Sequence, residues 1–346
     1  MIATKGISRR RVLAGVSAAA LAAPFSAAPF SAARAADNVK MSLEFRIYGG
    51  NAPMFLDGIF QKHGLNLTLD GSSGSDESVR RVATATYPFG LADASTLVAF
   101  AGRNPKVAPK IVLPIFDRFA ACIISLKKKP VQTIDDLKKA KIGSGTADAG
   151  SKIFPVLMYL NNVDVKSLDI TTVDVKLRDA MLLAGQVDAV IAFDYTSVFN
   201  LVGNGVKIED IVIYYFSAMG YGMFGNSLIV HPDVIAQSPD LVSRVAAATA
   251  EAWIYGAAHR QEAVDQVVKR EPLLDGGVEL QRLSWIYDKH ILTPNVRAHG
   301  LGSFDVEAAK KAIGLIKDGF QLAEAPALDA VYDPRFLPPL KDRMFA

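Results

Sequence analysis

The feature that most constrains the fold of this chain is a regular alternation of strand-like and helix-like segments through its first two thirds. Such alternation is typical of βαβ units and mainly parallel sheets. The pattern stops at the solvated run Lys127-Lys128-Lys129-Pro130 and then restarts. We therefore expect an α/β protein built from two α/β units.

The expected elements follow from apolar runs and their spacing. In the first unit we expect strands at 43–48, 65–69, 89–92, 107–116 and 120–126, and helices at 53–63, 76–86 and 95–102. In the second unit we expect strands at 141–143, 170–175, 189–193 and 212–215, and helices at 134–139, 151–161 and 177–185. After the apolar run 228–230 the pattern predicts mostly helices, at 232–236, 239–259, 261–270, 278–288 and 306–320.

The first 35 residues have the pattern of a removable export signal. Arginines in Ser8-Arg9-Arg10-Arg11-Val12-Leu13 precede a mildly apolar run and the small-residue site Ala33-Arg34-Ala35. This pattern is typical of a bacterial twin-arginine signal peptide. A membrane anchor would need about 20 consecutive apolar residues, and serines and prolines interrupt this run. We expect cleavage after Ala35 and a soluble periplasmic protein.

Most of the excess positive charge lies in the same segment. Residues 1–35 hold five of the 38 Lys and Arg residues and none of the 35 Asp and Glu residues. The mature chain is therefore near neutral, which argues against nucleic acid or an anionic membrane as a partner. The roughly 310 residues that remain are enough for two globular units. The single cysteine, Cys122, lies in an apolar run, so we expect it to be buried and unpaired.

Four loops of small polar residues follow predicted strands, at 49–52, 71–75, 93–96 and 144–151. Open α/β sheets bind their ligands at such strand ends. Free N–H groups at a helix start suit a carboxylate, a sulfonate, a phosphate or an electron-rich heterocycle. Serine and aspartate before a helix also act simply as N-caps, but their recurrence at successive strand ends favours a ligand site.

The residues indicate no particular catalytic or metal centre. Residues 145–152 read G-x-x-x-x-G-S-K, which places the lysine one position too late for a nucleotide P-loop. The five histidines lack metal-ligand spacing, one thiol cannot form a cysteine zinc site, and there is no G-x-S-x-G elbow. We expect no cofactor. A carboxylate pair among the aspartates near strand ends is left open, because no spacing forces two of them together.

Six aromatic residues lie at predicted strand ends or at the return crossing between the two units. About half should belong to ordinary core, and the rest are candidates to hold a flat ligand between two units. Phe193 and Tyr195 are the preferred candidates among Tyr48, Phe116, Phe193, Tyr195, Tyr221 and Phe224.

Four stretches carry a resemblance to a known family. They are Phe89-Gly-Leu-Ala-Asp-Ala-Ser-Thr-Leu, Ile134-Asp-Asp-Leu-Lys-Lys-Ala-Lys-Ile-Gly-Ser-Gly-Thr, Leu183-Ala-Gly-Gln-Val-Asp-Ala-Val-Ile-Ala-Phe, and 221–230. The chain resembles the periplasmic substrate-binding proteins of ABC importers, and within them the NMT1/THI5-like group, which includes binders of thiamine pyrimidine precursors. It is also similar to binders of alkanesulfonates, taurine and nitrate.

The resemblance implies a two-lobed type II periplasmic-binding-protein fold, the Venus flytrap, with a mainly parallel sheet flanked by helices in each lobe. Lobe 1 would comprise 36–121 and 226–346, and lobe 2 would comprise 122–225. The ligand-binding residues that it implies are Asn51, Ser73, Asp93, Ser95, Thr96, Phe116, Asp117, Gly145, Thr146, Asp148, Ala149, Phe193, Asp194, Tyr195 and Asn226.

Two departures from the family pattern bear on this expectation. The first loop, Gly50-Asn51-Ala52-Pro53, keeps the family's Asn and Ala-Pro but lacks its histidine, which leaves the contacts of that loop open. Some cytosolic relatives make the pyrimidine themselves with a cysteine-rich iron motif. A chain with one cysteine and an export signal does not fit that route.

The expected function is therefore that of a periplasmic solute-binding receptor. It would capture a small organic ligand between its lobes and deliver it to an ABC permease, its only link to the membrane. The resemblance points to a thiamine-precursor-like pyrimidine or another small heterocyclic or aromatic ligand ahead of a sulfonate, and to a monomer that is not an enzyme. The alternatives are a periplasmic enzyme that uses cleft aspartates, a pyrimidine-synthesis enzyme of the same superfamily, and a regulatory partner-binding module.

Overall fold

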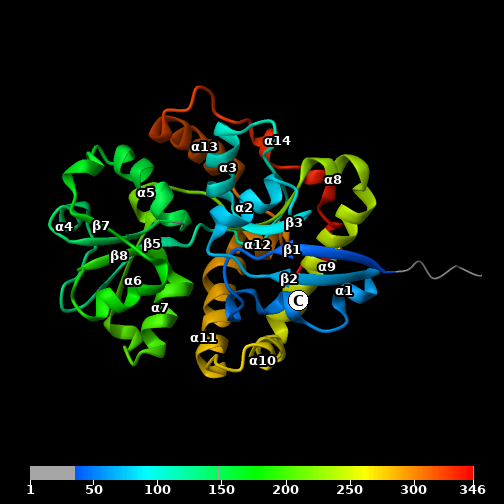
Figure 1. The fold of residues 1–346 in the computed structure, drawn as a ribbon, viewed down its shortest axis with the longest axis horizontal. Coiled ribbons are helices and arrows are strands. Elements are labelled where there is room, and N and C mark those ends of the chain that lie inside the picture. The colour runs from blue at the N-terminus through cyan, green and yellow to red at the C-terminus, as the bar shows by residue number, and fades with distance from the viewer. Residues whose placement is uncertain (1–35, 147, 346) are drawn as a thin grey trace, which may run out of the picture. The chain divides into compact units, whose positions relative to one another are not determined.

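The computed structural model describes residues 36–146 and 148–345, so the expected export signal lies outside the described residues. The described residues form two five-stranded sheets with helices packed around them (Figure 1). This arrangement confirms the expected α/β class.

The first sheet has the strand order β2-β1-β3-β10-β4. Strand β1 runs parallel to β2 and β3, whereas β10 runs antiparallel to β3 and β4. The bounds are β1 (Asp37–Ser42), β2 (Leu65–Asp70), β3 (Phe89–Asp93), β4 (Lys110–Pro114) and β10 (Asn226–Val230).

The second sheet has the order β7-β6-β8-β5-β9. Strand β6 runs parallel to β7 and β8, and β5 runs antiparallel to β8 and β9. The strand that runs antiparallel to its neighbours is β10 in the first sheet and β5 in the second. In each case it is the strand by which the chain enters that sheet from the other one. The bounds are β5 (Ala121–Leu126), β6 (Ile142–Gly145), β7 (Ile170–Val173), β8 (Ala189–Phe193) and β9 (Ile211–Tyr215).

Most helices lie within a few residues of the predicted positions. Several begin at a side-chain cap: Asp93 accepts from the backbone of Ser95 and Thr96, and Asp148 accepts from Ser151. The helices are α1 (Ile59–Lys62), α2 (Ser75–Ala83), α3 (Ala94–Arg103), α4 (Ile134–Leu137), α5 (Ala149–Leu160), α6 (Val175–Leu183), α7 (Asp194–Gly203), α8 (Pro232–Gln237), α9 (Pro239–Ala258), α10 (Arg260–Arg270), α11 (Gly276–Ile286), α12 (Pro294–His299), α13 (Val306–Phe320) and α14 (Leu328–Val331). A π-helical turn at Tyr287–Ile291 extends α11.

The predicted strand at 43–48 is wrong. The first strand is β1, which pairs with β2 over its whole length, and residues 43–48 form the loop at its carboxyl end. The Asn51 side chain holds that loop, because its amide accepts from the backbone N–H of Tyr48 and donates to the carbonyl of Arg46. The single helix predicted at 53–63 is also wrong, since a 3₁₀ segment (Gly49–Phe55) and α1 meet at Gly58, whose φ is +80°.

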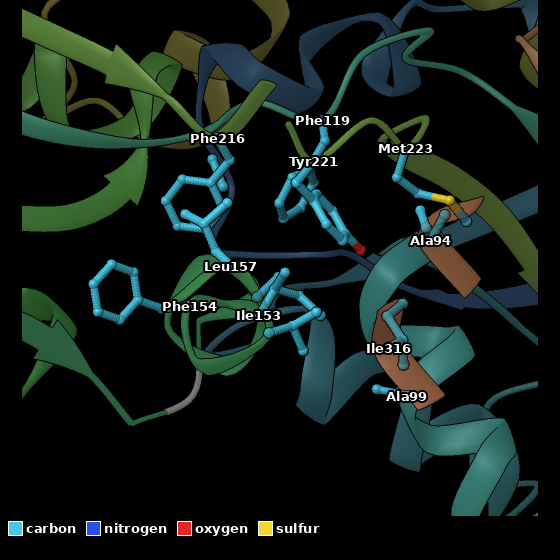
Figure 2. Close-up of a cluster of buried hydrophobic side chains, with 14 of the residues drawn as sticks. Ala94, Ala99, Phe119, Ile153, Phe154, Leu157, Phe216, Tyr221, Met223 and Ile316 are labelled. Carbon is cyan, nitrogen blue, oxygen red and sulfur yellow. The ribbon is translucent and has the colours of Figure 1, made fainter. Parts of the chain in front are cut away.

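Helices pack between the two sheets on two sides. On one side α13 and α3 contact α5, and on the other side α11 contacts α7. Figure 2 shows part of the first contact, with Ile153, Phe154 and Leu157 of α5 in the same apolar cluster as Ile316 of α13. A methyl group on Gly319 of α13 would lie 2.7 Å from the Val156 side chain, so this helix contact is close.

Cys122 is buried in β5 with a free thiol, as expected. In the part of the chain that the structure describes, no helix is long and apolar enough to cross a bilayer. The same part contains no group of three His, Cys, Asp or Glu residues placed to bind a metal ion.

Candidate functional site

A cleft of about 1100 Å³ lies at the carboxyl ends of strands from both sheets. The first sheet contributes the loops after β1 and β2, and the second contributes the loop after β6 and the start of α6. Helices α7 and α11 also line it. We call this space the outer cleft; it is lined by Phe45, Arg46, Ser72, Ser73, Thr146, 172–176, 178–180, Thr196, Phe199, Asn200, Gly203, Asn204, 273–275, Val278, Glu279 and Arg282.

A second, smaller cavity of about 40 Å³ shares five lining residues with the outer cleft and lies deeper between the same elements. We call it the inner cavity. Its volume is room for a few water molecules rather than a heterocycle. It is lined by Glu44, Phe45, Tyr48, Ser73, Gly74, Ser75, Asp148, Ala149, Val175, Arg178, Phe193, Tyr195 and Thr196.

Glu44 is the acidic group that the first sheet contributes to the inner cavity. Its side chain is 3% exposed, and its Oε1 accepts from Asn51 Nδ2 at 3.2 Å and, more weakly, from the Tyr48 hydroxyl at 3.4 Å. The other oxygen, Oε2, has no hydrogen-bond partner among the described residues. Burial raises the pKa of Glu44 to about 7, against the smaller lowering effects of its own backbone N–H and of those two side-chain hydrogen bonds.

A cluster of buried polar side chains lies where β3 ends beside β10. Asn226 is the register partner of Asp93, and Asp93 Oδ1 caps α3 through Ser95 and Thr96. Among the described residues, no hydrogen-bond partner is found for Thr96 Oγ1 or Asn226 Oδ1, whereas the Ser95 side chain interacts with both the Asp93 carboxylate and the Tyr221 hydroxyl. Burial raises the pKa of Asp93 to about 7. Buried polar atoms without partners are unusual in proteins and mark a place that water or a ligand satisfies.

The second sheet contributes a buried guanidinium to the inner cavity. Arg178 of α6 donates to Asp148 Oδ2 at 2.6 Å, to Ser197 Oγ at 2.7 Å and to the carbonyl of Ile191 at 3.0 Å. Burial raises the pKa of Asp148 in spite of that charge. Because all three of its guanidinium nitrogens already donate within the protein, Arg178 holds Asp148 at the start of α5 more than it offers a free anion receptor.

Asp194 lies at the start of α7, and both of its carboxylate oxygens are occupied. His290 Nε2 lies 2.8 Å from Oδ1, and Oδ2 accepts from the Tyr215 hydroxyl at 2.6 Å and from Trp285 Nε1 at 2.7 Å. Burial opposes ionisation of Asp194, but the nearby His290 and these hydrogen bonds outweigh it and lower its pKa. This cluster joins the start of α7 to Trp285 of α11 and to His290 of the π-helical turn that extends α11.

Arg282 of α11 makes a second connection to α7. Its guanidinium donates to the backbone carbonyls of Tyr195 at 2.5 Å and Thr196 at 3.1 Å, and it forms an ion pair with Glu279 at 2.8 Å. Glu279 in turn accepts from the backbone N–H of Gly49 at 2.6 Å. Since Arg282 and Glu279 are both buried, this network ties the loop after β1 to the start of α7.

Three aromatic side chains pack beside the inner cavity. The Phe193 and Tyr195 rings lie 5.4 Å apart and both line it, whereas Phe116 packs edge-on behind Tyr195 at 5.7 Å. Phe116 also contacts Trp253, which makes it part of the core of the first sheet.

The predicted site residues fall into three groups by location. Ser73, Thr146, Asp148, Ala149, Phe193 and Tyr195 line the outer cleft or the inner cavity. Asn51, Asp93, Ser95, Thr96, Phe116, Gly145, Asp194 and Asn226 line neither. Asp117 lies at a separate pocket of about 540 Å³ beside the chain crossings, where it accepts from Asn295.

Several of the second group support the site instead of lining it. Asn51 donates a hydrogen bond to Glu44. The backbone N–H of Asp93 donates to Ser75 Oγ at 3.0 Å, and Ser75 lines the inner cavity. Gly145 has a packing role, because a methyl group there would lie 2.7 Å from the Val175 side chain.

Glu44, Arg178 and Arg282 were missed by the sequence analysis. Glu44 was hidden by the wrong strand at 43–48. Arg178 and Arg282 lie inside helices and donate to residues up to 87 positions away in sequence, so no local sequence motif predicts their roles.

Comparisons with solved structures define the class of protein to which this fold belongs. The chain is similar to the periplasmic aliphatic sulphonate-binding protein SsuA from Escherichia coli, with a TM-score of 0.63, 12% identity, and coverage of 85% of this chain and 96% of that one. It is similarly related to the alkanesulfonate-binding protein SsuA from Xanthomonas axonopodis pv. citri bound to MOPS, with a TM-score of 0.62, 13% identity, and coverage of 86% and 98%. The protein therefore has the two-lobed fold of periplasmic binding proteins, as predicted.

The chain belongs to the NMT1/THI5-like family, whose model matches residues 57–263. It is also 22% identical over 227 residues to the riboflavin-binding protein RibY from Chloroflexus aurantiacus, a match that covers 65% of this chain. That match spans 63% of the length of the relative.

Proposed function

We propose that this protein is a periplasmic solute-binding receptor that holds a small organic ligand in the outer cleft, with one edge of the ligand reaching into the inner cavity, and delivers it to an ABC permease. One observation carries the proposal. The inner cavity, which both sheets line, contains a buried carboxylate oxygen, Glu44 Oε2, that has no hydrogen-bond partner among the described residues. A bound ligand would satisfy such atoms, whereas a purely structural core would have paired them.

The ligand that we propose is a thiamine-precursor-like pyrimidine or another small heterocyclic or aromatic compound. The side chains of Tyr48, Phe193 and Tyr195 line the inner cavity and would contact the edge of a flat molecule that reaches into it. A riboflavin-binding relative is consistent with a heterocycle. A sulfonate fits less well, because the buried guanidinium groups of Arg178 and Arg282 already have carboxylate partners, and an ionised Glu44 would repel an anion.

The mechanism that we propose is closure of two lobes, 36–121 with 226–346 and 122–225, around the ligand. Contacts made from both lobes would stabilise the closed state only, so that ligand binding shifts the population toward it. The bonds of Arg282 and Asp194 across the two parts would then add to the stability of the closed state. Export through a twin-arginine signal at 1–35, residence in the periplasm and a monomeric state are parts of the same proposal.

Native mass spectrometry of the purified protein tests the function directly. We expect a retained small molecule, or stoichiometric binding by calorimetry within a panel of pyrimidines, flavins, aromatic acids and sulfonates. Binding of no small molecule in either experiment would contradict a receptor function. Binding of sulfonates alone would contradict the proposed ligand class and leave the receptor function standing.

A second function is favoured by one specific observation. Burial raises the pKa values of Glu44 and Asp93 to about 7, which is the range that suits a general acid or base. A periplasmic enzyme that uses such carboxyl groups would consume the compound that it binds. Recovery of unchanged compound after long incubation with the protein would exclude this alternative for that compound, and appearance of a product would establish it.

A further inference from the structure

Glu44 is the one acidic side chain that the first sheet's loops place on the inner cavity, and it was not among the predicted site residues. It lies in the loop after β1, faces a cavity walled by the rings of Tyr48, Phe193 and Tyr195, and is 3% exposed. Among the described residues, no Lys, Arg or His side chain forms an ion pair with it. The other charged side chains that line the same cavity, Arg178 and Asp148, pair with each other.

The two oxygens of Glu44 have different surroundings. Oε1 is held by Asn51 Nδ2 and the Tyr48 hydroxyl, and Asn51 is itself fixed by two bonds to the loop backbone. Oε2 is buried and has no partner in the described chain. The loop thus orients the carboxyl group through one oxygen and leaves the other as a fixed acceptor.

We propose that Glu44 determines which heterocycle this site takes: its free oxygen accepts an N–H from an amino-substituted or protonatable nitrogen heterocycle. This inference rests on the proposed receptor function and narrows its ligand class. A buried carboxylate gains most from a donor that carries partial or full positive charge, because such hydrogen bonds are stronger than neutral ones. A ring edge that presents carbonyl oxygens would instead place acceptor against acceptor.

The substitution Glu44→Gln tests this with little change of shape. The amide oxygen of glutamine can keep the bonds from Asn51 and Tyr48, so the main change is that the free acceptor becomes an N–H donor. The matched control is Glu209→Gln, because Glu209 is exposed and lines none of the cavities described above.

The probes are 4-amino-5-hydroxymethyl-2-methylpyrimidine, whose edge carries an amino group, and 1,3-dimethyluracil, whose ring carries two carbonyl oxygens and no N–H. At pH 8 we expect Glu44→Gln to weaken binding of the aminopyrimidine by about 10- to 100-fold, the range for a hydrogen bond to a charged group. Binding of 1,3-dimethyluracil should change little or improve. Glu209→Gln should bind both probes like the wild type.

A second measurement needs no variant. Since burial holds Glu44 partly protonated near neutral pH, a ligand that donates to its carboxylate lowers its pKa and releases a proton. Calorimetry of the wild type at pH 6.5 in two buffers of different ionisation enthalpy should therefore show proton release with the aminopyrimidine. Burial also raises the pKa values of Asp93 and Asp148, so Glu44→Gln should reduce the release by the share of Glu44 rather than remove all of it.

The outcomes separate this inference from the function on which it rests. Unchanged affinity of Glu44→Gln for the aminopyrimidine, no proton release, or binding of 1,3-dimethyluracil alone would overturn the role of Glu44 and leave the receptor intact. Failure of the wild type to bind either probe or to retain any nitrogen heterocycle would overturn both the ligand class and this inference.

Discussion

The imidazole of His290 lies 2.8 Å from the carboxylate of Asp194, although 96 residues separate the two in sequence. Both side chains are buried, at 2% and 0% exposure. The prediction that Asp194 binds the ligand is untested, but both of its oxygens already have protein partners. The geometry gives Asp194 the role of joining α7 to the region that follows α11.

Asp194→Asn should strongly destabilise the protein. It would leave a buried imidazole without its carboxylate, and breaking a buried pair in this way costs about 3–5 kcal/mol. We expect that loss in the free energy of unfolding, measured with urea at pH 7. Asp210→Asn, which removes an exposed partner 3.8 Å from Lys127, should cost less than about 1 kcal/mol.

The same pair has a defined pH dependence. Since the pKa of Asp194 is lower in the folded protein than in the unfolded chain, its stabilisation is fully present above about pH 5 and is lost as the pH falls through the lowered value. The difference in unfolding free energy between wild type and Asp194→Asn should therefore shrink below about pH 4. A constant difference from pH 7 to pH 3 would contradict this assignment.

Glu44 and Asp93 should act in the opposite direction. Their pKa values rise from 4.5 and 3.8 to about 7 on folding, so the folded state binds more protons than the unfolded state between those values. Stability should fall as the pH rises from about 4 to 7, by up to about 3 kcal/mol for Glu44. Unfolding curves of Glu44→Gln should show a flatter profile over this range, and an identical profile would show that Glu44 is already ionised in the folded protein.

Arg282 and Glu279 should be energetically coupled. Arg282→Met would leave the buried Glu279 carboxylate with the Gly49 N–H as its remaining hydrogen-bond donor among the described residues, at a cost of about 3–5 kcal/mol. Adding Glu279→Gln removes the unpaired charge, so the double variant should be more stable than Arg282→Met alone. Unfolding of the four members of this double-mutant cycle measures the coupling, and additive effects would argue against it.

Tyr195→Ala should weaken ligand binding by more than tenfold, because Tyr195 supplies a wall of the inner cavity. Calorimetry with whichever compound the wild type retains provides the measurement. Tyr159→Ala, at a side chain exposed by 58% on α5, is the control and should bind normally. Unchanged affinity of Tyr195→Ala would remove that side chain from the site.

Much of the fold could be predicted from local patterns. The strands at 65–70, 89–93, 121–126 and 189–193 are short apolar runs flanked by polar loops, and the caps at Asp93 and Asp148 are visible as aspartates before helices. The first strand was predicted at the wrong place because residues 43–48 include four apolar residues, whereas residues 37–42 include only two. Pairing with β2, a contact between distant segments, decides which of the two becomes a strand.

The site was only partly predictable for the same reason. Loops at strand ends pointed to Ser73, Asp148 and Tyr195, since the carboxyl ends of strands meet at one edge of a sheet. Glu44 depended on knowing where β1 ends. The pairing of His290 with Asp194 and of Arg282 with the carbonyl of Tyr195 arises from how α11 packs on α7, which no spacing in the sequence encodes.

The close contact of Gly319 with Val156 has a consequence for the rates at which a ligand enters and leaves. Because α13 packs against α5 on one side and α11 packs against α7 on the other, wide separation of the two sheets would break helix packing at two places. We therefore expect slow exchange and a long residence time for any compound that the proposed receptor binds. Such kinetics suit a ligand that is scarce better than one whose concentration changes rapidly.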